Sequence, residues 1–220
     1  MTSRLSFFKF CPHCGSARFV DNDFKSRRCL DCGFVYYINP SAATAAFVVD
    51  GDGRMLVVRR KLDPAKGTLD LPGGFSDVGE SLEEGIAREV MEETGLEVSD
   101  PRFLFSLPND YLYSGFHVPT LDSFFLCRTR NATAVHAADD AASAEWVDIG
   151  SVRAELFGLA SVRKAVTEFL RNTSKYLKKI KKLSIIICVS KSFSYFCAFE
   201  LTDVSKELKN VALTINDYAR

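Results

Sequence analysis

Residues 74–96 constrain the fold of this chain more than any other segment. Ser81 and Glu84 have the spacing of a capping box, which predicts that a helix begins at this point. Apolar side chains at four-residue steps predict the buried face of that helix: Leu82, Ile86 and Val90. Gly95 is typical of the left-handed residue that ends a helix. The segment is therefore expected to be a glycine-rich loop, a short amphipathic helix and a turn.

Three glutamates share one face of this predicted helix: Glu89, Glu92 and Glu93. Their charges repel one another unless cations neutralise them, and hard divalent ions such as Mg²⁺ or Mn²⁺ suit carboxylate oxygens. Arg88 can pair with Glu84 or with Glu92, each four residues away, or reach back to Glu80. A solvated acidic face laced with salt bridges is the alternative. It explains the glutamates but not the glycine loop before them or Gly95 after them.

The rest of the central segment alternates apolar runs with turns. Two runs separated by an Asp-Gly-Asp-Gly turn predict a hairpin: 45–49 and 55–59. Pro72-Gly73-Gly74 breaks the chain before the predicted helix. Two more strands are expected at 102–107 and 122–128. Trp146 begins a short run that leads into a closing helix within residues 151–172.

The composition is that of an ordinary globular protein, with 47% hydrophobic and 25% charged residues. The chain has 28 basic residues (Lys plus Arg) and 28 acidic residues (Asp plus Glu), so its formal net charge is zero. This balance favours neither nucleic acid nor an anionic membrane as a partner, although nucleic acid is not excluded. No secretory signal opens the chain, and its longest apolar run, 185–189, is too short to cross a bilayer. We therefore expect a cytoplasmic protein with no membrane span.

Two Cys-x-x-Cys pairs lie near the start of the chain: Cys11, Cys14, Cys29 and Cys32. Two such pairs place four thiolates around one tetrahedral Zn²⁺. Because four protein ligands close the coordination sphere, we expect a structural Zn²⁺ and a zinc ribbon over residues 1–40. A redox dithiol pair and unliganded thiols are the alternatives. Cys127, Cys188 and Cys197 are isolated and are interpreted as packing residues, since an odd total of seven argues against a disulfide framework.

Residues 74–96 resemble the Nudix box, which reads glycine, five residues, glutamate, seven residues, then Arg-Glu-apolar-x-Glu-Glu-x-Gly-apolar. Every fixed position is filled in this sequence. The resemblance implies an α/β fold, a Nudix α/β/α sandwich with a mixed sheet, over residues 41–172. It also implies divalent-metal-dependent hydrolysis of a diphosphate bond in a nucleoside diphosphate linked to another moiety. Residues 173–220 would be a C-terminal extension of unknown role.

The same resemblance implies roles for individual residues. Glu92 and Glu93 match metal ligands, and Glu89 matches a position used as a ligand or a general base. Glu80 and Arg88 match the pair that supports the loop. Gly73 and Gly74 match the loop glycines whose backbone binds the diphosphate. The carbonyl of Gly74 matches a further metal ligand. A later acidic residue often joins the metal site, and Asp140 is the candidate here, whereas Glu145 is interpreted as a structural residue or a residue at the rim of the site.

A four-cysteine ribbon followed by a Nudix domain resembles the NADH pyrophosphatase group, which cleaves NAD(H) into NMN(H) and AMP. That group carries Ser-Gln-Pro-Trp after the box, whereas this chain has Ser-Leu-Pro-Asn at residues 106–109. The expected substrates therefore include NAD(H) and ADP-ribose. Polar and aromatic residues that follow could contact a base: Asn109, Tyr111, Tyr113 and Phe116. The alternative for the two tyrosines is that they are half-buried strand residues.

Two other classes of function remain open. One is a non-catalytic Nudix-fold sensor that binds a nucleotide, and the other is an RNA-binding zinc-ribbon protein. The intact box favours the enzyme over the sensor, and the neutral charge balance does not support the RNA-binding protein. The partner is expected to be a nucleotide-like small molecule. The oligomeric state is open, with a homodimer among its possibilities.

Overall fold

The computed structural model describes residues 4–129, 135–138 and 140–177. The chain divides into two units, residues 1–172 and 173–220. Of the second unit, the structure describes only residues 173–177, all of which are helical. The remainder of the predicted C-terminal extension lies outside the described residues.

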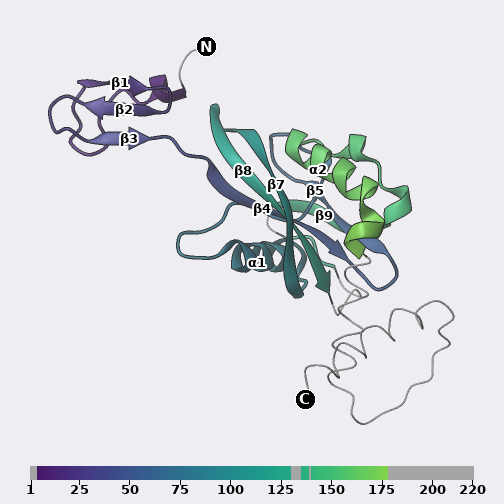
Figure 1. The fold of residues 1–220 in the computed structure, drawn as a ribbon. Coiled ribbons are helices and arrows are strands. Elements are labelled where there is room, and N and C mark those ends of the chain that lie inside the picture. The colour runs from purple at the N-terminus through teal and green to yellow at the C-terminus, as the bar shows by residue number, and fades with distance from the viewer. Residues whose placement is uncertain (1–3, 130–134, 139, 178–220) are drawn as a thin grey trace, which may run out of the picture. The chain divides into compact units, whose positions relative to one another are not determined.

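Residues 4–40 form a small unit that we call the cysteine ribbon. After a short 3-10 turn at Arg4–Phe7, three strands pair antiparallel in the order β1-β2-β3 (Figure 1). Their bounds are β1 Phe19–Asp23, β2 Ser26–Cys29 and β3 Val35–Tyr37. Its core is small, with Cys11, Phe19 and Cys29 buried against Phe8 and Tyr36. So little apolar volume is typical of a module that needs a metal or a disulfide to hold it.

The main sheet has six strands in the order β6-β5-β4-β8-β7, with β9 paired to β5. Their bounds are β4 Ser41–Val49, β5 Arg54–Arg60, β6 Leu69–Asp70, β7 Val98–Tyr113, β8 Phe116–Thr129 and β9 Ala141–Asp148. β4 and β8 run parallel along the whole of β4, while the other pairs are antiparallel. The predicted mixed sheet is confirmed.

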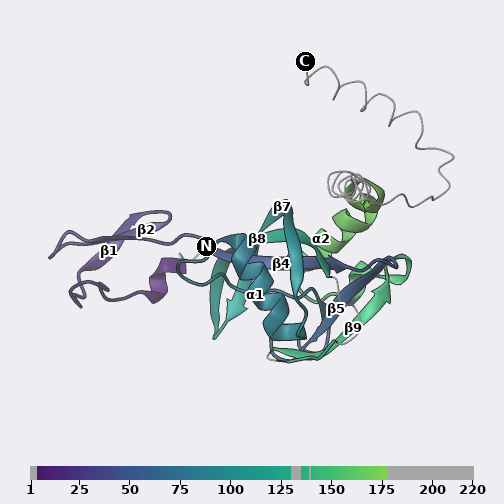
Figure 2. The same cartoon turned by 90° about the horizontal axis from the view of Figure 1, so that it is seen from below.

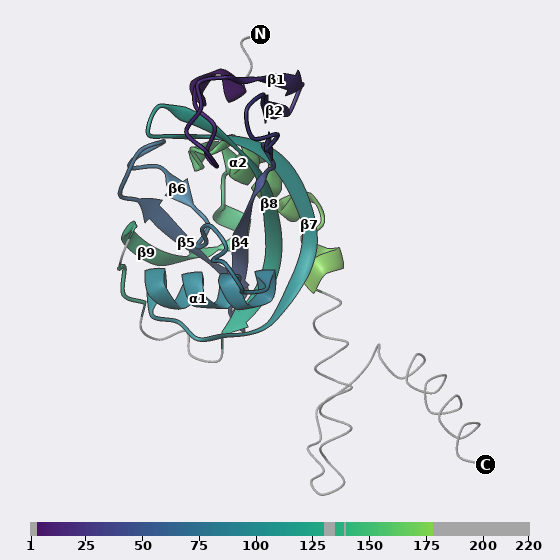
Figure 3. The ribbon, with the colours of Figure 1, turned by 90° about the vertical axis from the view of Figure 1, so that its left-hand side faces the viewer.

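Two helices cover opposite faces of this sheet, α1 (Leu82–Thr94) and α2 (Ala160–Arg171) (Figures 2 and 3). Ile86 and Val90 of α1 pack in one core cluster with Val48 of β4. Phe47, the neighbouring residue on β4, instead stacks on Phe169 of α2 with ring centroids 4.1 Å apart. Since side chains alternate along a strand, adjacent β4 residues serve the two layers, which gives the predicted α/β/α sandwich.

The local predictions around α1 are confirmed. The Ser81 hydroxyl accepts a hydrogen bond from the Glu84 N–H at 3.2 Å, and the Glu84 carboxylate accepts one from the Ser81 N–H at 2.8 Å. Gly95 ends the helix with φ 69° in the left-handed region. The turn after residue 49 also forms, with Val49 paired to Met55.

Other boundaries differ from the predictions. The strands expected at 102–107 and 122–128 are longer, because β7 and β8 continue as a two-stranded hairpin to the Tyr113–Phe116 pair. The closing helix begins at Ala160, and two short 3-10 turns precede it: Ile149–Ser151 and Ala154–Leu156. No helix in the described part of the chain is long and apolar enough to cross a membrane.

Candidate active site

The glycine loop, residues 72–80, is fastened to the edge of β4. The Ala46 N–H donates to the Pro72 carbonyl at 2.9 Å, and the Thr44 N–H donates to the Gly74 carbonyl at 2.8 Å. Gly73 lies between them with φ 147°, where a Cβ atom would overlap the Thr44 carbonyl and lie 2.7 Å from the Ala45 Cα. Only glycine lets the loop come this close to the strand.

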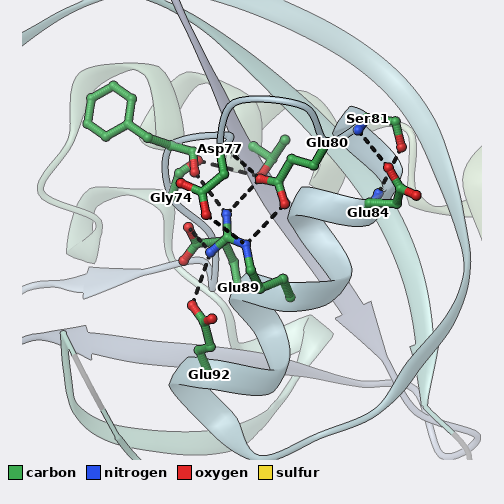
Figure 4. Close-up of polar contacts among 10 residues, drawn as sticks. Gly74, Asp77, Glu80, Ser81, Glu84, Glu89 and Glu92 are labelled. Atoms are coloured by element: carbon green, nitrogen blue, oxygen red, sulfur yellow. Dashed lines mark hydrogen bonds and ion pairs between the residues drawn. The ribbon is translucent and has the colours of Figure 1, made fainter.

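Arg88 connects the glycine loop to α1 through ion pairs with Glu80, Glu89 and Glu92, and these three carboxylates are labelled in Figure 4. Its guanidinium donates to both oxygens of Glu80, at 2.7 and 3.1 Å, and to the Phe75 carbonyl at 3.1 Å. Together with the Asp77 N–H, this ion pair lowers the pKa of Glu80 to about 2. Of the three partners that the sequence allowed, Arg88 contacts Glu80 and Glu92, while Glu84 is engaged in the helix cap.

The three glutamates predicted to share a helix face, Glu89, Glu92 and Glu93, border one cavity with the glycine loop, and we call them the acidic face. Arg88 donates to Glu89 and to Glu92, each at 3.0 Å. Glu93 is only 7% exposed and accepts a hydrogen bond from the Gly73 N–H at 3.1 Å. Burial raises the pKa of Glu93 to about 8, against that hydrogen bond. Neighbouring negative charges add to the rise: Glu89, Asp70 and Asp140.

The ligand types of the acidic face suit a divalent cation, but among the described residues only the four cysteines lie close enough together to surround one ion, so the carboxylates would have to move together to bind it. Carboxylate oxygens are the ligands that Mg²⁺ and Mn²⁺ prefer, and a cation beside the acidic face would offset the repulsion among its charges. The Gly74 carbonyl accepts hydrogen bonds from the Thr44 N–H at 2.8 Å and from the Thr44 hydroxyl at 3.5 Å, so the hydroxyl would have to turn away for this carbonyl to bind an ion. Asp140 borders the same cavity. Glu145 lies on β9 outside the cavity lining, and its exposed carboxylate faces Arg59 at 3.9 Å.

The cavity has a volume of about 620 Å³, which suits a small-molecule ligand. Asn109, Tyr111 and Tyr113 of β7 line it, so the two tyrosines are strand residues and cavity residues at once. The Tyr111 ring packs edge-on against Phe75 of the glycine loop, with centroids 5.8 Å apart. Phe116 is not in the lining and instead packs against Phe7 at 5.7 Å.

The four cysteines of the ribbon form a second cluster, separate from the acidic face. Their sulfurs all lie within 4.8 Å of one another, with Cys11 to Cys32 at 3.7 Å and Cys14 to Cys29 at 3.6 Å. Four sulfurs at ~2.3 Å from one tetrahedral Zn²⁺ would be roughly 3.8 Å apart, so the cluster fits that ion without rearrangement. The Cys32 N–H, as the largest influence, lowers the pKa of Cys29 to about 6, so the first thiolate of the cluster forms there. Against the Ser16 N–H, hydrogen bonds with the neighbouring sulfurs raise the pKa of Cys14 to about 12, and the pKa of Cys32 is raised as well.

Comparison with known proteins settles the family. A model of the NUDIX domain matches residues 39–169, which is more than half of the 220 residues. The chain belongs to the Nudix family. The matched Nudix region holds the six-stranded sheet, the glycine loop, the acidic face and most of α2.

Individual Nudix relatives support the same assignment. The chain is 39% identical over 98 residues to a protein of Chromobacterium violaceum and 29% identical over 173 residues to one of Vibrio atlanticus. Both are named NAD-capped RNA hydrolase NudC. These matches cover 44% and 78% of this chain, but only 36% and 59% of the relatives. A Nudix hydrolase structure from Nitrosomonas europaea has the same fold, with TM-score 0.62 at 17% identity, over 74% of this chain and 91% of that one.

The Nudix cavity also contains polar residues that were not among the predicted site residues, including Arg60, Asp70, Thr120 and Asp122. Arg60 donates to Asp70 at 2.6 Å and to the Tyr111 hydroxyl at 3.2 Å. Thr120 and Asp122 alternate along β8, a pattern that also describes a strand facing solvent. Only the folded sheet reveals that this face borders the cavity.

Proposed function

We propose that this protein hydrolyses a diphosphate bond in a nucleoside diphosphate linked to another moiety, with Mg²⁺ or Mn²⁺ as the cofactor. The observation that carries the proposal is the acidic face, gathered beside the Gly73–Gly74 backbone at one wall of a 620 Å³ cavity. NAD(H) and ADP-ribose are the first substrates to test. The former is suggested by the names of two relatives and by the cysteine ribbon that precedes the Nudix domain.

In hydrolysis, a water oxygen bonds to one phosphorus, the bridging P–O bond breaks, and two phosphate products leave. The bound cations would supply charge neutralisation at the phosphates and a more acidic water. Glu92, Glu93, Asp140 and the Gly74 carbonyl are the residues that would hold them. Glu89 would orient the attacking water and take up its proton, since its carboxylate is fixed by Arg88 at 3.0 Å.

The remaining residues of the box position the reacting groups. The pair of Arg88 and Glu80 keeps the glycine loop against α1, so that the Gly73–Gly74 backbone meets the diphosphate at a fixed distance from the acidic face. Asn109, Tyr111 and Tyr113 would contact the nucleoside or the linked moiety.

A substrate panel tests this function. NADH, NAD, ADP-ribose, diadenosine polyphosphates and oxidised dGTP would each be incubated with Mg²⁺ and with Mn²⁺, and the products separated by chromatography. We expect turnover of a compound in which a diphosphate joins two moieties. If no compound is turned over while one binds tightly, the protein is a nucleotide sensor and the proposed hydrolase activity is wrong.

The acidic face gives a matched pair of variants. Glu93→Gln keeps the shape of the side chain and its hydrogen bond from Gly73 but loses the charge, so kcat should fall by roughly 100-fold or more. Glu83→Gln makes the same change on an exposed part of the same helix and should leave the rate near normal. Thermal unfolding of both variants would verify that the fold is retained. A near-normal rate for Glu93→Gln would remove Glu93 from the metal site.

We also propose that the cysteine ribbon holds a structural Zn²⁺, because its four sulfurs already have the spacing of a tetrahedral site. A cytoplasmic location is part of this proposal, since a reducing compartment keeps such thiols available for the metal.

A further inference from the structure

One wall of the cavity belongs to the sheet rather than to the glycine loop and α1. Along β8, Thr120, Asp122 and Phe124 line the cavity, whereas the residues between them do not. Phe124 contacts Phe47, which stacks on Phe169 of α2, so this wall lies on the α2 face of the sheet. Asp122 is paired to β4 on one side and to β7 on the other, so it lies inside the sheet and not at an edge.

Besides Glu93, two carboxyls of this cavity are buried, and they differ in their partners. Asp70 is 6% exposed and accepts hydrogen bonds from Arg60 at 2.6 Å and from the Leu71 N–H at 2.9 Å. Asp122 is 9% exposed, and its one hydrogen bond to a described residue comes from the Thr120 hydroxyl to Oδ1 at 2.6 Å. Asp70 therefore has a cationic partner and Asp122 has none within the part of the chain that the structure describes.

The two carboxyls are close enough to influence each other. Burial raises the pKa of Asp70, Arg60 opposes the rise, and the negative charge of Asp122 adds to it. The charge of Asp122 therefore disfavours ionisation of the neighbouring Asp70 carboxyl. The Oδ2 atom of Asp122 has no hydrogen-bond donor among the described residues. Because Oδ2 is not one of the fully buried atoms without a partner, this acceptor is open to the cavity and available to a ligand that supplies a donor.

We propose that Asp122, held in place by Thr120, determines specificity by accepting a hydrogen bond from an N–H or O–H group of the substrate. This inference rests on the proposed function, and it names the half of the substrate that lies away from the reacting diphosphate. The donor is uncharged or cationic, because a phosphate at this position would face a carboxylate. Two sources have this chemistry, the ribose hydroxyls and the amino or amide group of a base.

The decisive variant is Asp122→Asn, which keeps the shape and removes the charge. Its control is Asp110→Asn, the same change at a half-exposed residue that pairs with His117 outside the cavity lining. Both would be assayed with ADP-ribose and NADH in Mn²⁺, with kcat and KM measured separately. We expect kcat/KM of Asp122→Asn to fall about 10- to 100-fold, mainly through KM, while Asp110→Asn and both melting temperatures stay close to wild type.

Substrate analogues identify the donor. Wild type should lose affinity for 2′- or 3′-deoxyribose analogues if a hydroxyl is the donor, and for hypoxanthine analogues if the adenine amino group is. On the analogue that lacks the donor, Asp122→Asn should cause no further loss. An equal loss on every compound, or no loss on any, would overturn the assignment of Asp122. If wild type turns over none of the compounds, the proposed hydrolase function is wrong. The role of Asp122 is then tested by calorimetric binding of ADP-ribose, and equal affinity of wild type and Asp122→Asn would overturn this inference independently.

Discussion

At the scale of single residues, the most restricted position in the site is Gly73. It combines a backbone conformation that L side chains rarely adopt with a distance of 2.7 Å between its Cβ position and the Ala45 Cα. Its N–H also donates to Glu93, so the same residue sets the approach of the loop to β4 and the orientation of one carboxylate. A change here should therefore affect stability and activity together.

Gly73→Ala should destabilise the protein by about 3 kcal/mol or more, since the backbone of the loop must leave β4. This corresponds to a fall in melting temperature of roughly 6–12 °C. Gly53→Ala is the control, because Gly53 also has positive φ, 81°, but open space around its Cβ position. Its cost should be about 1 kcal/mol. Equal melting temperatures for the two variants would show that the close approach to β4 does not matter.

The residues that sequence reasoning could place are those with a local signature. The box identifies Glu80 and Arg88 by spacing alone, although which partners Arg88 takes depends on the cap, which occupies Glu84. Asp122 has no such signature. Its position in the cavity wall depends on pairing of β8 with β4 and with β7, the two strands that flank Asp122 in the sheet.

At the scale of elements, α1 is the best determined by its own sequence, because both of its ends carry capping residues. Ser81→Ala removes the acceptor for the Glu84 N–H and should lower the free energy of unfolding by about 1 kcal/mol, or roughly 2–4 °C in melting temperature. Ser81→Asp keeps an acceptor, adds a favourable charge at the helix N-terminus and should stay near wild type. Denaturant unfolding would measure both, and a loss of the same size in Ser81→Asp would contradict the capping role.

Strand pairing was harder to predict than the helix. The turn between β4 and β5 has a local signal, yet the main partner of β4 is β8, along its full length and in parallel. Parallel pairing joins residues far apart in the chain, and no turn residue marks it. The outer part of the β7–β8 hairpin was likewise underestimated, because backbone pairing continues there without a continuous apolar run.

At the scale of the whole molecule, the chain contains two candidate metal centres of opposite chemistry, soft sulfurs in the cysteine ribbon and hard oxygens on the acidic face. The cysteine spacing was enough to predict the first, because a Cys-x-x-Cys pair is a local signal. The match to the Nudix family over residues 39–169 accounts for the second. What the sequence could not supply was the shape of the cavity, which depends on residues from α1, α2 and five strands.

The zinc proposal has its own test. Cys32→Ser alters an exposed ligand position without disturbing the small ribbon core, and we expect it to lower the zinc content of the purified protein from one per chain to well below one. Cys127→Ala changes a cysteine in the core of the Nudix domain and should retain one zinc. Elemental analysis would measure both, and full zinc content in Cys32→Ser would rule out four-sulfur coordination.

The two candidate metal centres would assemble differently during synthesis of the protein, because Arg88 lies beside only one of them, the acidic face. Its guanidinium already bridges Glu89 and Glu92, so it acts as an internal counterion and the acidic face can assemble before any divalent ion arrives. At the proposed zinc site, by contrast, folding of the ribbon would be coupled to capture of the metal. Zinc scarcity should therefore reduce how much correctly folded protein a cell accumulates, whereas magnesium or manganese scarcity should reduce how fast each finished molecule works.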